Sequence, residues 1–141
     1  MMAQPVRFPY TPAGTTEARL MPRLPLTLNY EQRSIEIVGL LDTGAAVNVL
    51  PYSAGVALGA EWDQQATVIS LTGTVGSVEA RALVVWAALS HLRFQHPVRL
   101  VFAWTRSDET PILLGQTTFF MEFDVCFFRS QAAFEIRPKD G

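Results

Sequence analysis

The chain has 141 residues, enough for one domain with a hydrophobic core and too few for two. Its formal net charge is −2 and its 11 basic residues are scattered, which excludes the basic patch that nucleic acid or an anionic membrane requires. Hydrophobic residues make up 49% and the mean hydropathy is +0.19, which fits either a mostly β core or extra apolar surface buried in a dimer.

The N-terminal segment, residues 1–20, carries prolines without hydrophobic periodicity, which predicts a loose arm ahead of a folded domain at residues 21–141. The arm lacks an apolar core of signal-peptide length. The longest apolar stretch, residues 82–92, is far short of the roughly 20 residues of a spanning helix. The only cysteine, Cys126, follows phenylalanines and is expected to be a buried thiol. We therefore expect a cytoplasmic protein without a membrane partner.

Alternation of apolar and polar residues predicts a β-hairpin with one buried face, over residues 24–30 and 34–37 across a polar turn. Its second strand becomes wholly apolar over residues 38–41, as expected where a strand enters the core. Further strands are expected at 48–51, 67–71, 76–88, 92–104 (one bent strand or a pair), 123–128 and 133–137, and short helices at 52–58 and 116–121. Many short strands without a βαβ rhythm predict an all-β, barrel-like single domain with one or two short helices.

One carboxylate lies between two apolar runs: residues 38–51 read Val-Gly-Leu-Leu-Asp-Thr-Gly-Ala-Ala-Val-Asn-Val-Leu-Pro. Asp42 thus follows a buried strand, where an ionisable group is unfavourable unless it is paired, hydrogen-bonded or used. A strand-to-turn junction is the alternative, because Asp and Gly are common turn residues. Apolar residues on both sides do not fit a solvated turn, however. A second apolar segment, residues 111–115, ends on a glycine, and together the two segments favour a functional carboxylate at Asp42.

In this order, the Leu-Leu-Asp-Thr-Gly-Ala segment around Asp42 and the later Ile-Leu-Leu-Gly ending at Gly115 resemble the retropepsin-like aspartic proteases. The resemblance covers roughly residues 24–137 and implies a closed β-barrel of the acid protease fold. Aspartic proteases use two carboxylates, and this chain has one Asp-Thr-Gly. The resemblance therefore also implies a homodimer with both Asp42 side chains at the two-fold axis. The pair would share one proton, activate water and cleave an extended peptide without a covalent intermediate or a cofactor.

The resemblance assigns roles to the neighbouring residues. Thr43 would bond across the dimer axis, Gly44 would let its amide approach the carboxylate, and Ala45 would lie beside the substrate backbone. Leu114 and Gly115 would form the floor of the site. The plain alternatives are a turn hydroxyl at Thr43 and a strand-end glycine at Gly115.

A glycine-bearing hairpin, the flap, covers the cleft in this family. The candidate here is the stretch Gly73, Thr74, Val75 and Gly76 between two predicted strands. Glycine-containing hairpins are common in β proteins, so an ordinary hairpin is the alternative.

The chain departs from the retroviral members at two positions. Those members carry an acidic residue after the Gly-Ala and an arginine after the late glycine, and the two form a salt bridge. Ala46 and Gln116 occupy these positions in this chain. Both charged partners are therefore missing together and no single charge is left without its partner, but the geometry of the dimer near the site need not be that of the viral enzymes. His91 and His96 lack cysteine or acidic neighbours at ligand spacing, so no metal is expected.

The leading hypothesis is an aspartic endopeptidase acting on a peptide or protein substrate as a homodimer. The first alternative is a non-catalytic module of the same fold that serves dimerisation or peptide binding. The second is an unrelated monomeric β-barrel binding protein in which Asp42 is a structural turn residue. The three tryptophans lie among strand-like residues and are expected in the core rather than in a base-stacking platform.

Overall fold

The computed structural model describes residues 4–13, 19–73, 76–89 and 96–139, and these are mostly β. The strands are β1 (Val6–Pro9), β2 (Arg23–Tyr30), β3 (Arg33–Leu41), β4 (Asn48–Leu50), β5 (Val68–Gly73), β6 (Gly76–Leu89), β7 (Val98–Thr105), β8 (Leu113–Leu114), β9 (Phe123–Phe128) and β10 (Ala133–Pro138). The helices are α1 (Tyr52–Ala57) and α2 (Phe119–Glu122), with 3-10 turns η1 (Trp62–Gln64) and η2 (Arg129–Gln131).

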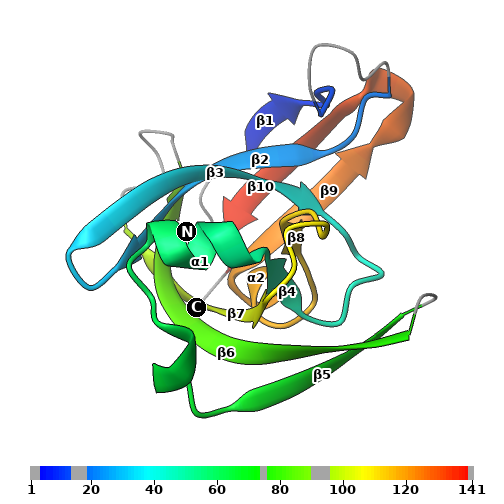
Figure 1. The fold of residues 1–141 in the computed structure, drawn as a ribbon. Coiled ribbons are helices and arrows are strands. Elements are labelled where there is room, and N and C mark those ends of the chain that lie inside the picture. Colours follow the sequence, from blue (N-terminus) through cyan, green and yellow to red (C-terminus); the bar gives the residue numbers. More distant parts are fainter. Residues whose placement is uncertain (1–3, 14–18, 74–75, 90–95, 140–141) are drawn as a thin grey trace.

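Most strands belong to one sheet that closes on itself. Its order is β2-β3-β8-β4-β7-β6-β5, and an additional pairing joins β2 to β6. Strands β2, β3, β8, β4, β7 and β6 therefore form a ring, and β5 extends from it as the first strand of a hairpin with β6 (Figure 1). Leu24, Leu26 and Leu28 of β2 are 0%, 1% and 0% exposed. The alternation in the sequence thus correctly predicted the buried face of the β2–β3 hairpin.

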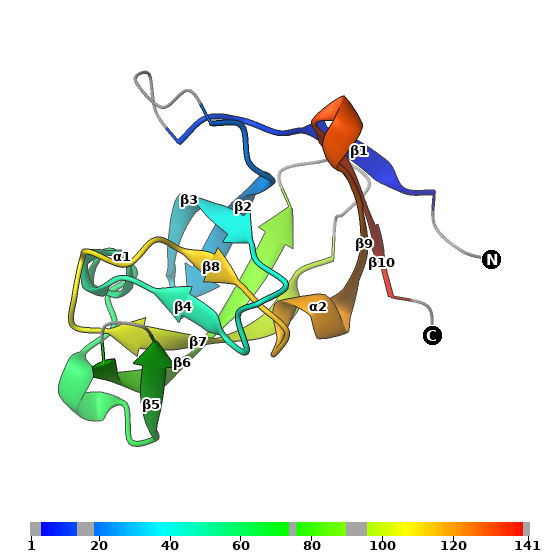
Figure 2. The same ribbon diagram turned by 90° about the vertical axis from the view of Figure 1, so that its right-hand side faces the viewer.

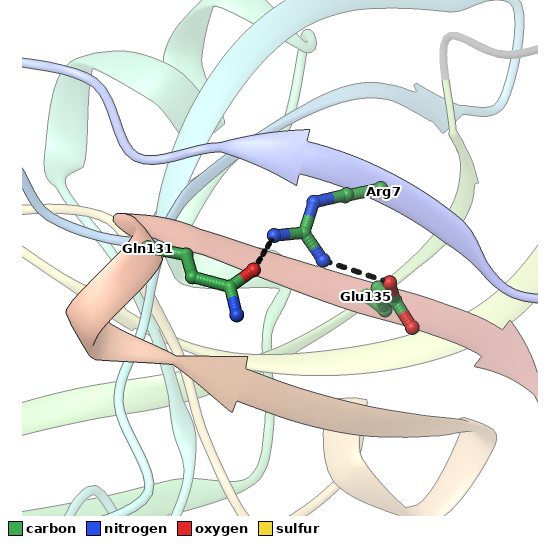
Figure 3. Close-up of polar contacts among 3 residues, drawn as sticks. All are labelled: Arg7, Gln131 and Glu135. Atoms are coloured by element: carbon green, nitrogen blue, oxygen red, sulfur yellow. Dashed lines mark hydrogen bonds and ion pairs between the residues drawn. The ribbon is translucent and has the colours of Figure 1, made fainter.

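A smaller sheet, in the order β1-β10-β9, lies beside the ring (Figure 2). Strand β1 pairs with β10 in antiparallel register, with Arg7 opposite Glu135. Figure 3 shows the Arg7 guanidinium donating to both Glu135 and Gln131. The Arg7 Nη1 to Glu135 Oε2 distance is 3.0 Å. These contacts attach the N-terminal strand to the C-terminal hairpin on the outer face of the sheet.

The prediction of a loose arm over residues 1–20 is not correct for Val6–Pro9, which form β1. The prolines concealed an alternation in which Val6 is 8% exposed and the Phe8 ring stacks on Phe134 at 5.4 Å. Pro9 is compatible with this strand because β1 is at the edge of the sheet.

Two buried-residue predictions are wrong. Cys126 is exposed, because it lies opposite Glu135 on the outer face of the β9–β10 pair. Trp86 is 50% exposed, because its neighbours Val85 and Ala87 point inward and successive side chains of a strand alternate. Trp62 and Trp104 are buried, as predicted.

Most of the remaining elements lie within two residues of their predicted bounds, but helix α2 begins at Phe119, three residues later than predicted. Strand β7 begins at Val98, directly after Pro97; residues 92–95 of the segment predicted as one bent strand or a pair lie outside the described residues. No helix in the described part of the chain is long and apolar enough to cross a membrane.

Candidate active site

The Asp-Thr-Gly loop joins β3 to β4, and β8 lies between these two strands. Leu41 at the end of β3 pairs with Leu114 in parallel register, whereas Val49 of β4 pairs with Leu113 in antiparallel register. The Asp42 amide extends the first pairing by donating to the Leu114 carbonyl at 3.0 Å. Asp42 therefore stands where a buried strand ends, and its backbone is fixed to the end of β8.

Within the loop, the backbone folds back on the carboxylate. The Gly44 amide donates to Asp42 Oδ1 at 3.0 Å, and the Ala45 amide donates to the Asp42 carbonyl at 3.1 Å. A Cβ on Gly44 would lie 3.3 Å from the same carboxylate oxygen, so glycine suits this close approach. Asp42 is half-buried, while Thr43 and Gly44 are exposed. The loop thus presents an oriented carboxylate beside an open tip.

The segment that begins at Gly115 packs under this loop. Gly115 is buried, and a Cβ there would lie 2.6 Å from the Val47 carbonyl oxygen and 2.7 Å from the Ala45 carbonyl oxygen. The next two amides, of Gln116 and Thr117, donate to the carbonyls of residues 45 and 46 at 2.9 and 3.0 Å. The side chain of Leu114 is fully buried. Leu114 and Gly115 therefore lie directly beneath the loop.

Two further polar side chains are part of this arrangement, one bonded to Gly115 and one to the loop itself, and sequence reasoning gave neither a role. Asn48 is 0% exposed, and its Oδ1 accepts the Gly115 amide at 2.8 Å. Gln116 Nε2 donates to the Thr43 carbonyl at 2.8 Å. The signal for Asn48 was present, since it is the only polar residue in the run from Ala45 to Leu50. Gln116 was identified only as the absence of an arginine.

A cavity of about 510 Å³ opens beside the carboxylate. Asp42, Gly44 and Ala45 line one part of it. Ile69 and Leu71 of β5, together with other aliphatic side chains, line another part. The β5–β6 hairpin thus faces the Asp-Thr-Gly loop across the cavity.

Two of the four predicted flap residues, Gly73 and Gly76, are at the end of this hairpin. Gly73 and Gly76 pair with each other there, and Thr74 and Val75 lie outside the described residues. The structure therefore brings the hairpin that carries the flap candidate to the cavity that contains the carboxylate.

Among the described residues that line the cavity, Asp42 is the only acidic one. Other aspartates have separate contacts: Asp108 accepts the Ser53 amide at 2.8 Å, and Asp124 pairs with Arg137 at 3.3 Å. No group of three or more potential metal ligands forms in the described part of the chain.

Searches against protein-family models and against curated proteins find no match. Among solved structures, the chain is similar to a retropepsin-like aspartic protease from Rickettsia conorii, with a TM-score of 0.62 and 11% identity over 94% of this chain and 98% of that chain. It is also similar to the EIAV protease complexed with the inhibitor HBY-793, with a TM-score of 0.54 and 19% identity over 73% of this chain and 88% of that chain. The chain therefore has the retropepsin fold, which confirms the fold predicted from its sequence.

Proposed function

We propose that this protein is an aspartic-type endopeptidase that acts as a homodimer. The observation that carries the proposal is the position of Asp42. The chain has a retropepsin fold with a largely aliphatic cavity of about 510 Å³. Among the described residues that line this cavity, Asp42 is the one acidic side chain. A hydrogen-bonded carboxylate beside an apolar cavity is more typical of a catalytic group than of a residue in a solvated turn.

The dimer follows from the chemistry. Among the described residues, one carboxylate lines the cavity, and activating water while polarising a carbonyl requires two. A two-fold axis at the loop would place the partner's Asp42 opposite this one. The exposure of Thr43 supports this arrangement, because the tip of the loop is accessible to a second copy. Its hydroxyl would then bond across the axis.

In the proposed mechanism, the two carboxylates share one proton. The ionised Asp42 takes a proton from water while the protonated one donates to the scissile carbonyl. The water oxygen bonds to the carbonyl carbon and gives a gem-diol. As the C–N bond then breaks, one carboxylate takes a proton from a gem-diol hydroxyl and the other donates its proton to the leaving nitrogen, so that an acid and an amine are released and the pair again holds one proton. Gly44 would hold the carboxylate, Ala45 would lie beside the substrate backbone, and Leu114 and Gly115 would support the loop.

The substrate would be an extended peptide with apolar side chains flanking the cut. The support is the aliphatic lining supplied by Val47, Val49 and Leu113, and by Ile69 and Leu71 of the hairpin. That hairpin would act as the flap that closes over the peptide. The cytoplasmic location expected from the sequence stays a prediction.

Cleavage of a peptide library by wild type, Asp42→Asn and Asp63→Asn tests this proposal. Asp42→Asn preserves shape but removes the ionisable group, so cleavage should disappear while the melting temperature is retained. Asp63 lies in η1, so Asp63→Asn is the matched control and should cleave like wild type. An Asp42→Asn protein that folds, dimerises and still binds the library peptides, next to a wild type that cleaves none, would support the non-catalytic module instead.

A further inference from the structure

Two uncharged side-chain amides lie at the base of the Asp42 loop: Gln116 bonds to the loop directly, and Asn48 bonds to Gly115, which packs against it. We propose that Asn48 and Gln116 are positioning residues that fix this loop on the segment following β8. The expected effect on kinetics rests on the proposed function. The hydrogen bonds of Asn48 and Gln116 at the base of the loop, here called the clasp, can be tested independently of cleavage.

Asn48 joins three parts of the fold at a point that is closed to water. Its Oδ1 accepts the Gly115 amide at 2.8 Å, and its Nδ2 donates to the Val101 carbonyl at 3.0 Å and to Thr118 Oγ1 at 3.2 Å. Thr118 Oγ1 in turn accepts the Val101 amide at 3.0 Å. A buried polar side chain is tolerated when its hydrogen bonds are made, and here both nitrogen protons and the oxygen have partners. This network fixes the start of β4, the middle of β7 and the residues before α2 relative to one another.

The Asn48 contact reaches Asp42 in two steps. Gly115 directly follows Leu114, whose carbonyl accepts the Asp42 amide at 3.0 Å. Gly115 also touches the loop from below, because the position of a Cβ on it is within 2.7 Å of the Ala45 carbonyl oxygen. When Asn48 fixes the Gly115 amide, it therefore fixes both the backbone anchor of Asp42 and the floor of the loop. Without Asn48, the Gly115 amide would be a buried donor without this partner.

Gln116 holds the other side of the loop. Its backbone amide donates to the Ala45 carbonyl at 2.9 Å, and its side-chain Nε2 donates to the Thr43 carbonyl at 2.8 Å. One residue thus bridges the loop on both sides of Gly44, whose amide holds the Asp42 carboxylate. The Gln116 side chain is exposed, so its removal need not disturb the core.

The kinetic test uses Asn48→Ala, Gln116→Leu and a matched control, Gln32→Leu. Gln32 is an exposed residue in the turn between β2 and β3, away from the cavity. We expect Asn48→Ala and Gln116→Leu to lower kcat between about 10- and 100-fold with KM nearly unchanged, because small displacements of a reacting group have effects of that size. Gln32→Leu should leave both constants at the wild-type value. Each assay is run at two protein concentrations, so that loss of dimer is distinguished from loss of turnover.

The test of the clasp is amide hydrogen exchange at Gly44 and Gly115, followed by NMR. Exchange at both amides should accelerate in Asn48→Ala, exchange at Gly44 should accelerate in Gln116→Leu, and neither should change in Gln32→Leu. If Asn48→Ala does not fold, Gln116→Leu decides. Wild-type kcat and wild-type Gly44 exchange in folded Gln116→Leu would overturn the inference. If wild type cleaves nothing, the proposed function fails, and the exchange rates still determine whether the clasp exists.

Discussion

The close packing of Gly115 under the loop makes Gly115→Ala the sharpest test of the site geometry. The added Cβ would lie 2.6 Å from the Val47 carbonyl oxygen and 2.7 Å from the Ala45 carbonyl oxygen. Ordinary contact begins near 3.4 Å, so the loop or β8 must move by 0.8 Å (3.4 minus 2.6). Both obstacles are backbone atoms, so no side chain can rotate away. Overpacking of this kind destabilises by about 1–3 kcal/mol, and the displaced loop should lower kcat by about 100-fold.

The assay pairs thermal unfolding with cleavage kinetics, and Gly55→Ala is the control. A Cβ on Gly55 would lie 2.2 Å from the Trp104 indole, in the core and away from the Asp42 loop. Gly55→Ala should therefore lose stability as well, yet keep the wild-type kcat per folded molecule. A Gly115→Ala protein with wild-type melting temperature and wild-type kcat would show that the loop does not rest on Gly115, and the reasoning about the floor would fail.

Four further outcomes are expected. Mixing wild type with excess Asp42→Asn should lower the wild-type activity, because mixed dimers hold one ionisable carboxylate; activity proportional to added wild type would contradict a shared site. Raising the pH should weaken the wild-type dimer more than the Asp42→Asn dimer, since two ionised carboxylates repel across the axis; sedimentation of both forms checks this. Trp104→Ala, at a fully buried position, should lower the free energy of unfolding by about 3–5 kcal/mol in denaturant titration. Trp86→Ala, at a position that is 50% exposed, should lower it by less than half as much.

The parts of the fold that were predictable from the sequence depend on local pattern. Alternation over β2 and β3 gave the hairpin because the face of each side chain follows from its position along the strand. Strand β1 was missed because its partner lies at the other end of the chain, with Arg7 opposite Glu135. No local pattern specifies such a pairing, and Pro9 indicated a break instead.

The candidate site shows the same division. Asp42 and Gly115 were found because each interrupts an apolar run in a recognisable order. Asn48 also interrupts such a run, but its importance depends on the Val101 carbonyl and the Thr118 hydroxyl, and the sequence does not reveal that these lie beside it. The polar contacts of a buried amide are a property of the assembled fold, whereas the motif is a property of the chain.

The structure also explains how the loop is held without the retroviral pair of charges. At the two positions concerned, Ala46 is exposed and Gln116 spans from the Thr43 carbonyl to the Ala45 carbonyl. A neutral amide thus makes, within one chain, a contact that does not depend on the ionisation of either partner or on salt. Among the described residues that line the cavity, Asp42 is the only acidic one. Such a loop, fixed at its base and open at its tip, suits a site in which the second carboxylate arrives with a second subunit.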